Sequence, residues 1–377
     1  MITLDTALRI TSLILSNHIF YKDNVMRKTI LATIVGLSFI TVSVSAGEMV
    51  STVDEFYSDN GVITTENNYP TLETSRQMLK NQSLVGVNKI LHKRMLTPTD
   101  NQPVVRMNRD TFYSFAVVDV SKGATITMPD IPKGKYMSIQ GVTEDHRIQA
   151  MKYGSGTFNL TTHTGDHLYI VIRLDATFTE AEVKAIQNKM SITAQSSTKF
   201  ESTQVKKDTF HAVEGSLKAQ MPSLVKEYGA EALYGMFTDP RDSSNELFNQ
   251  KKYAVGAAIG WGGAQLVDNV YEVSGNYPAT QCHQATFEDP NNKAFWSITV
   301  YNKKGFMFND LANLSSNTAK PNKDGTYTIN FGCGNDAINN IVTKNDTGGF
   351  NLGIRHYMPS NKVRNEGYRL LPLVKAM

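Results

Sequence analysis

Two groups of short apolar runs, separated by a helical middle, dominate the hydrophobic pattern of this chain. The runs are rich in β-branched and aromatic residues and are bounded by glycine and proline turns, which is typical of strands. They predict strands at 111–120, 124–128, 136–142 and 168–174, and again at 295–301, 327–331 and 350–357. Many short strands between such turns favour antiparallel sandwiches or jelly rolls over a parallel sheet.

Helical spacing marks the segments around these strands. Apolar residues recur at helical intervals between 70 and 95, where Gly86 is expected to interrupt the pattern. The residues from Thr179 to Glu182 form a capping box ahead of a helix that runs to about Met190. After a polar loop at 195–210, helices are predicted at 222–237 and 245–259, and the Gly-Trp-Gly-Gly run at 260–263 ends the second of them.

The fold class that follows is mainly β and α+β overall, with two antiparallel β-sandwich (jelly-roll-like) domains joined by a helical segment. The expected divisions are a loose start at 47–68, a first sandwich with its leading helix at 69–190, the helical connection at 191–262 and a second sandwich at 263–377. This length is sufficient for two cores, because domains are typically about 100–200 residues long.

Both predicted sandwiches contain the same short pattern. The first has Tyr-Met-Ser-Ile-Gln at 136–140 and closes on Arg173, and the second has Phe-Trp-Ser-Ile-Thr at 295–299 and closes on Arg355. We formulate the hypothesis that the two halves arose by duplication. It predicts two sandwiches of similar topology.

Residues 26–46 have the organisation of an export signal. Arg27 and Lys28 form the positive start, an apolar run follows from Ile30, and Val-Ser-Ala at 44–46 fits the small-residue cleavage rule. Gly47 is then the first mature residue, and residues 1–25 are an upstream extension or a misassigned start. The alternative is an N-terminal membrane anchor, although the apolar run is shorter than the ~20 residues that a span needs.

Charge and cysteine content restrict the class of partner and the compartment. Lys+Arg 38 against Asp+Glu 35 leaves a formal charge of +3, which gives no electrostatic argument for nucleic acid or for an anionic membrane. No stretch after the signal has the length and apolarity of a membrane span. We therefore expect a periplasmic or secreted protein whose partner is a small molecule or a carbohydrate, and a homo-oligomer stays open.

The two cysteines, Cys282 and Cys333, leave two alternatives. In an exported protein an even pair favours a disulfide, and the other reading is two buried free thiols. Neither cysteine belongs to a C-x-x-C, so no redox or zinc motif supports a metal or a cofactor.

The densest polar cluster is Asn108-Arg109-Asp110-Thr111, at the head of a predicted strand. Arg109 is a candidate clamp for a carboxylate, sulfate or sugar hydroxyl, Asp110 a candidate base, and Tyr113 a candidate hydroxyl or stacking face. The alternative is a structural network at the start of the strand, in which Asp110 and Asn108 bind backbone N–H groups and Arg109 ties the domains together.

A second cluster, Arg355-His356-Tyr357, closes the last long strand. Alternation predicts that Arg355 and Tyr357 share one face while His356 points to the other. The pair is a candidate site for an anion or a sugar ring, and the alternative is a hydrogen-bonded plug between the domains. Because a buried arginine is costly without a partner, we expect partners for Arg173 as well as Arg355.

His146 follows a predicted strand in the run Glu-Asp-His-Arg at 144–147. It is a weak candidate for a general base that a carboxylate orients, and the alternative is a solvated charged turn. A metal site from His146, His163, Asp166 and His167 has no H-x-x-x-H helix or cysteine cluster to support it. We therefore assign no metal site and no evident cofactor, and a metal stays open as the alternative.

Several segments together resemble two known families. In the first half these are 69–76, Asn108-Arg109-Asp110-Thr111-Phe112-Tyr113 and 134–140, and in the second half 260–263, 296–301, 324–326 and 350–357. The first half resembles the domain of unknown function numbered 1254, and the second resembles its usual partner, number 1214. The resemblance covers about 65–375 and implies two sandwiches, frequent export in bacteria and no established reaction. The chain departs from it at 337–342, which lacks the tryptophan that members of the second family often carry there.

Two functions from different classes remain. The first is a small-molecule or carbohydrate-related enzyme, with hydrolysis as one option, whose site lies between the domains. It would use Arg109, Asp110, Tyr113, Arg355 and Tyr357, with Asp110 and His146 as the weak catalytic candidates. The second is a non-catalytic ligand- or glycan-binding module, or an envelope-associated structural protein. No G-x-S-x-G elbow, phosphate loop or dinucleotide fingerprint is present.

Overall fold

The first sandwich consists of two antiparallel sheets. The computed structural model describes residues 47–102, 105–242 and 248–377. The larger sheet has the order β3 (Leu91–His92), β4 (Thr111–Asp119), β9 (His167–Asp175), β6 (Met137–Thr143), β7 (Lys152–Tyr153). The smaller has the order β10 (Ser191–Ala194), β5 (Ala124–Met128), β8 (Gly156–Leu160). The four strands predicted in this half are thus present as β4, β5, β6 and β9, with bounds that differ by at most one residue.

A dry core fills the space between these two sheets. Ala116, Ile126, Ile170 and Ile172 are fully buried there, as the alternation of apolar positions requires. Helix α3 (Glu180–Gln187) adds Val183 to this core, and its capping box is formed as predicted.

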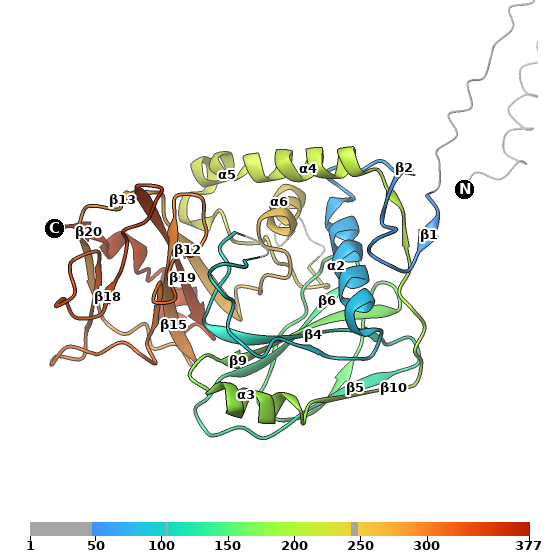
Figure 1. Ribbon diagram of the computed structural model, residues 1–377, viewed down its shortest axis with the longest axis horizontal. Helices are drawn as coiled ribbons and strands as arrows, with labels where there is room; N and C mark the ends of the chain where they lie inside the picture. The colour runs from blue at the N-terminus through green and yellow to red at the C-terminus, as the bar shows by residue number, and fades with distance from the viewer. Residues whose placement is uncertain (1–46, 103–104, 243–247) are drawn as a thin grey trace, which may run out of the picture. The chain divides into compact units, whose positions relative to one another are not determined.

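A helical layer covers the other face of the larger sheet (Figure 1). It consists of α2 (Tyr69–Val85), α4 (Lys207–Ala219), α5 (Met221–Tyr228), the short η1 (Gly229–Glu231) and α6 (Gln250–Gly260). Met78 and Leu79 of α2 pack in one cluster with Val117 of β4 and Val255 of α6. This layer lies beside the first sandwich, so the helical segment is part of its packing and more than a connection.

The helical pattern from 70 to 95 is interrupted at Gly86 as predicted, whereas the polar loop expected at 195–210 needs correction. The helix expected from 70 to 95 ends at Val85, because Gly86 adopts φ 85° and its N–H bonds to Gln82 O. The polar loop expected at 195–210 contains the short strand β11 (Ser202–Thr203) and the start of α4. Before the helical layer, β1 (Met49–Val50) pairs with β11, and β2 (Tyr57–Val62) follows it.

The second sandwich is again two sheets with a core between them. One has the order β12 (Asn269–Val273), β19 (Gly349–Tyr357), β15 (Phe295–Asn302), β16 (Asn313–Ser315), with β13 (Tyr277–Pro278) also on β19. The other has the order β18 (Asn340–Ile341), β17 (Tyr327–Phe331), β14 (His283–Phe287), β20 (Lys375–Ala376). Trp296, Ile298, Phe331 and Leu352 are fully buried between them. The short helices α7 (Asn361–Arg364) and η2 (Leu371–Leu373) precede β20.

The two sandwiches have the same connectivity. In each, the last long strand runs between the first and the third (β4-β9-β6 and β12-β19-β15), and the opposite sheet repeats the pairing β10-β5-β8 as β20-β14-β17. The registers also agree, since Ser138 pairs with Arg173 and Ser297 pairs with Arg355. The similar topology that the duplication hypothesis predicts is confirmed.

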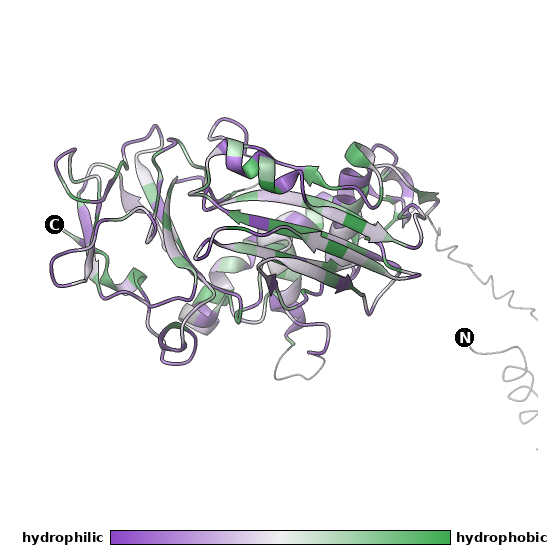
Figure 2. Cartoon of the chain, turned by 90° about the horizontal axis from the view of Figure 1, so that it is seen from below, coloured by the Kyte–Doolittle hydropathy of each residue, from purple (hydrophilic) through white to green (hydrophobic). Residues whose placement is uncertain are grey.

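Alternation along these strands leaves each large sheet with a second face of mixed polarity. Figure 2 shows green and pale or purple segments following one another along the strands. In the first sandwich this face is covered partly by the helical layer, and the rest approaches the second sandwich.

The predicted upstream extension at 1–25 and the predicted signal peptide at 26–46 lie outside the described residues. Within the described ranges, no helix has both the length and the apolarity to cross a membrane.

Candidate functional site

The two large sheets turn corresponding rows of polar residues toward each other. Each row has an arginine in the middle strand, flanked by a tyrosine and a serine of the neighbouring strands. The rows are Tyr113–Arg173–Ser138 and Tyr271–Arg355–Ser297. Because directly paired residues share a face of a sheet, the three side chains of each row lie together.

Asp110 is the centre of the hydrogen-bond network that joins the sandwiches. It directly precedes β4 and is 3% exposed. Its carboxylate accepts hydrogen bonds from Ser297 Oγ at 2.7 Å, Asn313 Nδ2 at 2.6 Å and Tyr357 Oη at 2.9 Å. All three donors belong to the second sandwich, so Asp110 is enclosed and engaged by side chains rather than open to a ligand.

Arg355 is the cation of this network. Its Nη1 lies 3.8 Å from Asp110 Oδ2 and 3.3 Å from Thr299 Oγ1. Its Nη2 donates to Arg106 O at 2.8 Å and to Tyr301 Oη at 2.9 Å. The guanidinium therefore has a carboxylate and three neutral partners, which is what a buried arginine requires.

Alternation on β19 is as predicted. Arg355 and Tyr357 both face Asp110, while His356 points into its own sandwich. There His356 Nε2 lies 2.8 Å from Glu272 Oε1, which also accepts from the backbone near the C-terminus. His356 is thus part of the packing of the second sandwich.

Arg109 and Tyr113 lie beside this network. Arg109 Nη1 donates to Thr97 O at 2.7 Å and lies 3.0 Å from Asp310 Oδ1, whose side chain is largely exposed. Tyr113 Oη accepts from Asn108 Nδ2 at 2.8 Å. Arg109 therefore connects to the second sandwich through Asp310, in line with the structural alternative.

Arg173 has weaker partners than its counterpart. Its Nη1 donates to Gln140 Oε1 at 2.9 Å, its Nη2 lies 3.5 Å from Gly262 O, and its guanidinium stands 5.7 Å from the centre of the Tyr113 ring. In the described part of the chain no carboxylate forms an ion pair with it. Partners are present, as expected, but all of them are neutral.

The structure buries His146 completely, so it is not part of a solvated turn. Its φ is 60°, and its Nε2 accepts a hydrogen bond from Gly262 N at 3.0 Å. The rings of Phe237, Tyr253 and Trp261 lie 5.9–6.5 Å from its own. Burial lowers the pKa of His146 to about 3, so the imidazole is neutral at physiological pH.

The other histidines of this region bind carboxylates. His163 Nε2 lies 3.1 Å from Asp145 Oδ2, and His167 Nδ1 lies 3.6 Å from Glu144 Oε1. Among the residues that the structure describes, no three or more histidine, cysteine, aspartate and glutamate side chains are grouped as metal ligands.

Cys282 and Cys333 form a disulfide, which is the first of the two alternatives from the sequence. It joins the start of β14 to the residues after β17, with a sequence separation of 51. The disulfide cross-links the ends of β14 and β17, two neighbouring strands of the sheet β18-β17-β14-β20. It has no counterpart in the first sandwich.

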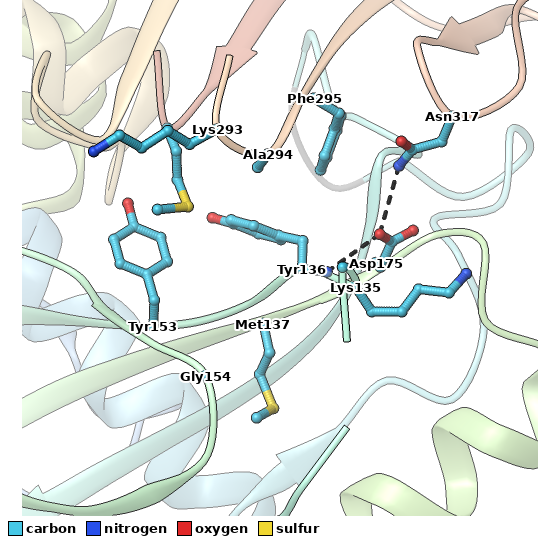
Figure 3. Close-up of a pocket in the computed structure, with 12 residues that line it drawn as sticks. Lys135, Tyr136, Met137, Tyr153, Gly154, Asp175, Lys293, Ala294, Phe295 and Asn317 are labelled. Atoms are coloured by element: carbon cyan, nitrogen blue, oxygen red, sulfur yellow. Dashed lines mark hydrogen bonds between the residues drawn. The ribbon is translucent and has the colours of Figure 1, made fainter. Parts of the chain in front are cut away.

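A pocket of about 140 Å³ opens beside the Asp110 network (Figure 3). Its walls are the rings of Tyr136, Tyr153 and Phe295 with Met358, and its polar side is Asp175 and Asn317. The Lys135 and Lys293 chains also line it but run away from the Tyr136 ring in Figure 3. Phe295 stacks on Tyr357 with ring centres 4.2 Å apart, so the pocket wall continues into the network.

Sequence reasoning did not select this pocket, although the repeat pattern carries the signal. Tyr136 and Phe295 occupy the same place in the two patterns, two residues before Ser138 and Ser297. Their rings meet edge to face with centres 5.6 Å apart, so the pocket forms where corresponding strand starts approach each other. Asp175, two residues after Arg173, reaches the same place from β9.

Comparison with solved structures supports the fold. The crystal structure of the VPA0106 protein from Vibrio parahaemolyticus has a TM-score of 0.60 and 16% identity over 83% of this chain and 97% of that one. An uncharacterized protein from Burkholderia cenocepacia has a TM-score of 0.45 and 10% identity over 78% of this chain and 84% of that one. No curated protein matches the chain. At these identities the likeness to VPA0106 concerns the fold alone.

Two family models match, in the order that the motifs indicate. The protein of unknown function model DUF1254 matches residues 87–172, and the protein of unknown function model DUF1214 matches residues 274–361. The first match covers the large sheet of the first sandwich, and the second covers most of the second sandwich. The chain therefore contains a DUF1254 match followed by a DUF1214 match, which is the tandem order that its motifs indicate.

Proposed function

We propose that this protein binds a small carbohydrate-related molecule, without chemical conversion, in the pocket between Tyr136 and Phe295. The observation that carries the proposal is the composition of the pocket: aromatic ring faces on one side, and a carboxylate with an amide on the other. Ligand pockets of this kind combine apolar and aromatic walls with a few polar groups that fix orientation.

The hydroxyls of the two tyrosines are not available to a ligand. Tyr136 Oη donates to Ser138 Oγ at 2.9 Å, and Tyr153 Oη donates to Asp268 Oδ1 at 2.7 Å. Both hydroxyl protons are thus engaged inside the protein. Tyr136 and Phe295 are buried, so the half-buried ring of Tyr153 is the aromatic surface that a ligand can reach. Such surface suits the apolar face of a sugar ring.

The polar side keeps acceptor capacity. Asp175 Oδ1 accepts short bonds from Thr177 N and Oγ1, at 2.8 and 2.6 Å. Asp175 Oδ2 has only longer contacts, 3.3 Å from Tyr136 N and 3.5 Å from Asn317 Nδ2. A ligand hydroxyl at this oxygen would find an acceptor whose present contacts are long.

The volume favours a ligand no larger than about one ring, or the end of a longer chain. At about 140 Å³ the pocket is smaller than the ~300–1,000 Å³ of typical drug-sized sites. The weak catalytic candidates do not line it: Asp110 is engaged with the second sandwich, and His146 is enclosed by aromatic rings. This is why binding is favoured over catalysis.

We also infer that the protein acts outside the cytoplasm. The sequence at 26–46 has the organisation of an export signal, and the disulfide Cys282–Cys333 is of the kind that persists in oxidising compartments.

Calorimetric titration with neutral and acidic monosaccharides tests the binding function. Asn317→Ala and Tyr153→Ala should each weaken the affinity for the best sugar at least tenfold. Asn335→Ala, an exposed asparagine outside the pocket, should leave the affinity unchanged. Binding that the pocket variants do not alter, or no binding at all, would refute the proposal.

A turnover assay separates binding from hydrolysis. Incubation with short oligosaccharides should release no new reducing ends. Release that disappears in Asp175→Asn while sugar binding remains would favour the hydrolase alternative instead.

A further inference from the structure

We propose that Arg173, with the hydroxyls of Tyr113 and Tyr271, forms a binding site for a small carboxylate between the two sandwiches. The site is separate from the pocket of Figure 3, which none of these three residues lines. The proposal does not depend on sugar binding there.

The first argument is charge balance. Arg173 is 7% exposed, and its partners are Gln140 Oε1 at 2.9 Å and Gly262 O at 3.5 Å. Both are neutral, and a buried cation normally requires an anionic partner and further hydrogen bonds. Arg355, in the corresponding place, has the Asp110 carboxylate 3.8 Å away.

The second argument concerns Asp268, the aspartate that corresponds to Asp110. Asp110 stands one residue before β4, and Asp268 stands one residue before β12. Asp110 reaches across to Arg355, but Asp268 instead accepts from Tyr153 Oη at 2.7 Å and Met151 N at 3.2 Å. Burial raises the pKa of Asp268 while the Arg173 charge acts in the opposite direction, although the two groups form no ion pair in the described part of the chain. The first sandwich therefore lacks the carboxylate that the second one receives.

The third argument is the supply of hydrogen-bond donors. Tyr113 Oη accepts from Asn108 Nδ2 at 2.8 Å, and Tyr271 Oη accepts from Ala264 N at 3.2 Å. Among the described residues neither hydroxyl donates its own proton to an acceptor. Each of the two tyrosine residues as a whole is half-buried. Burial lowers the pKa of Arg173, and the neighbouring tyrosine oxygens, that of Tyr113 first, raise it on balance.

Together these groups match a carboxylate. A guanidinium binds a planar carboxylate through two parallel N–H groups, and the two hydroxyl protons supply donors for the remaining lone pairs. The network around Asp110 shows the same solution made within the chain, with the Ser297 and Tyr357 hydroxyls on a carboxylate beside an arginine.

The test uses acetate as the probe and the second sandwich as the matched control. At constant ionic strength, replacing chloride by acetate should raise the melting temperature of the full chain along a saturable curve. Acetate should no longer raise the melting temperature of Arg173→Met, but it should still raise that of Arg355→Met. The comparison is made within each variant, so a difference in their stability without acetate does not matter. An acetate effect that is absent from the native chain, or equally present in Arg173→Met, would overturn the proposal.

Two milder variants keep the test valid should an arginine variant not fold. Tyr113→Phe and Tyr271→Phe retain the rings and remove only the hydroxyls. Each should raise the acetate concentration at half-saturation about tenfold or more, because hydrogen bonds to charged groups are the strong ones. Unchanged half-saturation in both variants would also overturn the proposal. Variants of the Figure 3 pocket, such as Asn317→Ala, should not shift the acetate curve, so this result is distinguishable from the sugar titration.

Discussion

The two sandwiches share their connectivity and differ in how they treat the same buried charge. Each places an arginine on its closing strand, between a tyrosine and a serine of the neighbouring strands. Arg355 is balanced by Asp110, which the first sandwich supplies, while Arg173 receives only neutral partners from its surroundings. The comparison teaches that the same backbone can hold an arginine with a carboxylate partner in one copy and an arginine with only neutral hydrogen-bond partners in the other.

The difference between the two arginines arises from the different contacts of two corresponding aspartates, Asp110 and Asp268. Asp110 and Asp268 occupy the same place before the first strand of their sandwiches. Asp110 bridges to the other sandwich, whereas Asp268 bonds to Tyr153 and to the backbone of Met151 across the junction. In the described part of the chain Asp268 forms no direct ion pair with Arg173, although the two charges interact. The junction is thus asymmetric in charge although its strands correspond.

Replacing the two arginines one at a time should give the largest contrast. Arg355→Met leaves the Asp110 carboxylate buried without its cation, which should lower the free energy of unfolding by about 3–5 kcal/mol. Arg173→Met removes a buried charge that has no carboxylate partner, so its effect should stay within about 1 kcal/mol in carboxylate-free buffer. Urea denaturation measures both, and equal losses would remove the distinction between the sandwiches.

The disulfide gives the next largest difference, because only the second sandwich has one. Cys282→Ser with Cys333→Ser should cost about 2–4 kcal/mol of unfolding free energy. Hydrogen exchange should speed up in β14 and β17, while the corresponding strands β5 and β8 keep their protection. Uniform loss of protection in all four strands would mean that the sandwiches unfold as one cooperative unit.

Acid should weaken the first sandwich through His146. An unfolded histidine protonates near pH 6.5, whereas burial holds the pKa of His146 at about 3. Between these values the unfolded chain binds more protons, so stability falls as the pH decreases. His146→Gln, which keeps an acceptor for Gly262 N, should reduce the loss between pH 7 and pH 5 by about 2 kcal/mol, measured by urea denaturation at both values. An unchanged pH dependence would show that His146 titrates as in the unfolded chain.

The smallest expected effect concerns the helices that precede the last strand of each sandwich. Thr179→Ala removes the capping box of α3 and should cost about 1 kcal/mol. Ser360→Ala removes the N-cap of α7 together with the bond from Ser360 Oγ to Pro290 O. Thermal melts should show a loss at least as large for Ser360→Ala, and a loss confined to Thr179→Ala would contradict the equivalence of the two helices.

Much of the fold was open to prediction because its determinants are local. The strands at 124–128 and 327–331 have the bounds expected from their β-branched and aromatic runs. The capping box of α3 is formed, since Thr179 and Glu182 need only their own neighbours. Even the duplication was visible, because the Ser-Ile and closing-arginine patterns recur along the chain.

The residues of the Asp110 network were predicted but their roles were not, and the pocket beside them was not predicted at all. Alternation put Arg355 and Tyr357 on one face, and both do meet Asp110. No local rule says that Asp110 bonds to Ser297, because the two are 187 residues apart. His146 was misjudged for the same reason, since a charged run looks solvated until Trp261 and Tyr253 are packed against it.

The sequence by itself determined the long strands and their faces, the two-sandwich class and the two cysteines that form the disulfide. These follow from side-chain periodicity, turn chemistry and capping, which act over a few residues. Only the tertiary structure decided which acid neutralises which arginine, which rings form the pocket and which histidine is buried. Those outcomes depend on how the two sandwiches pack, and packing joins residues that no spacing along the chain relates.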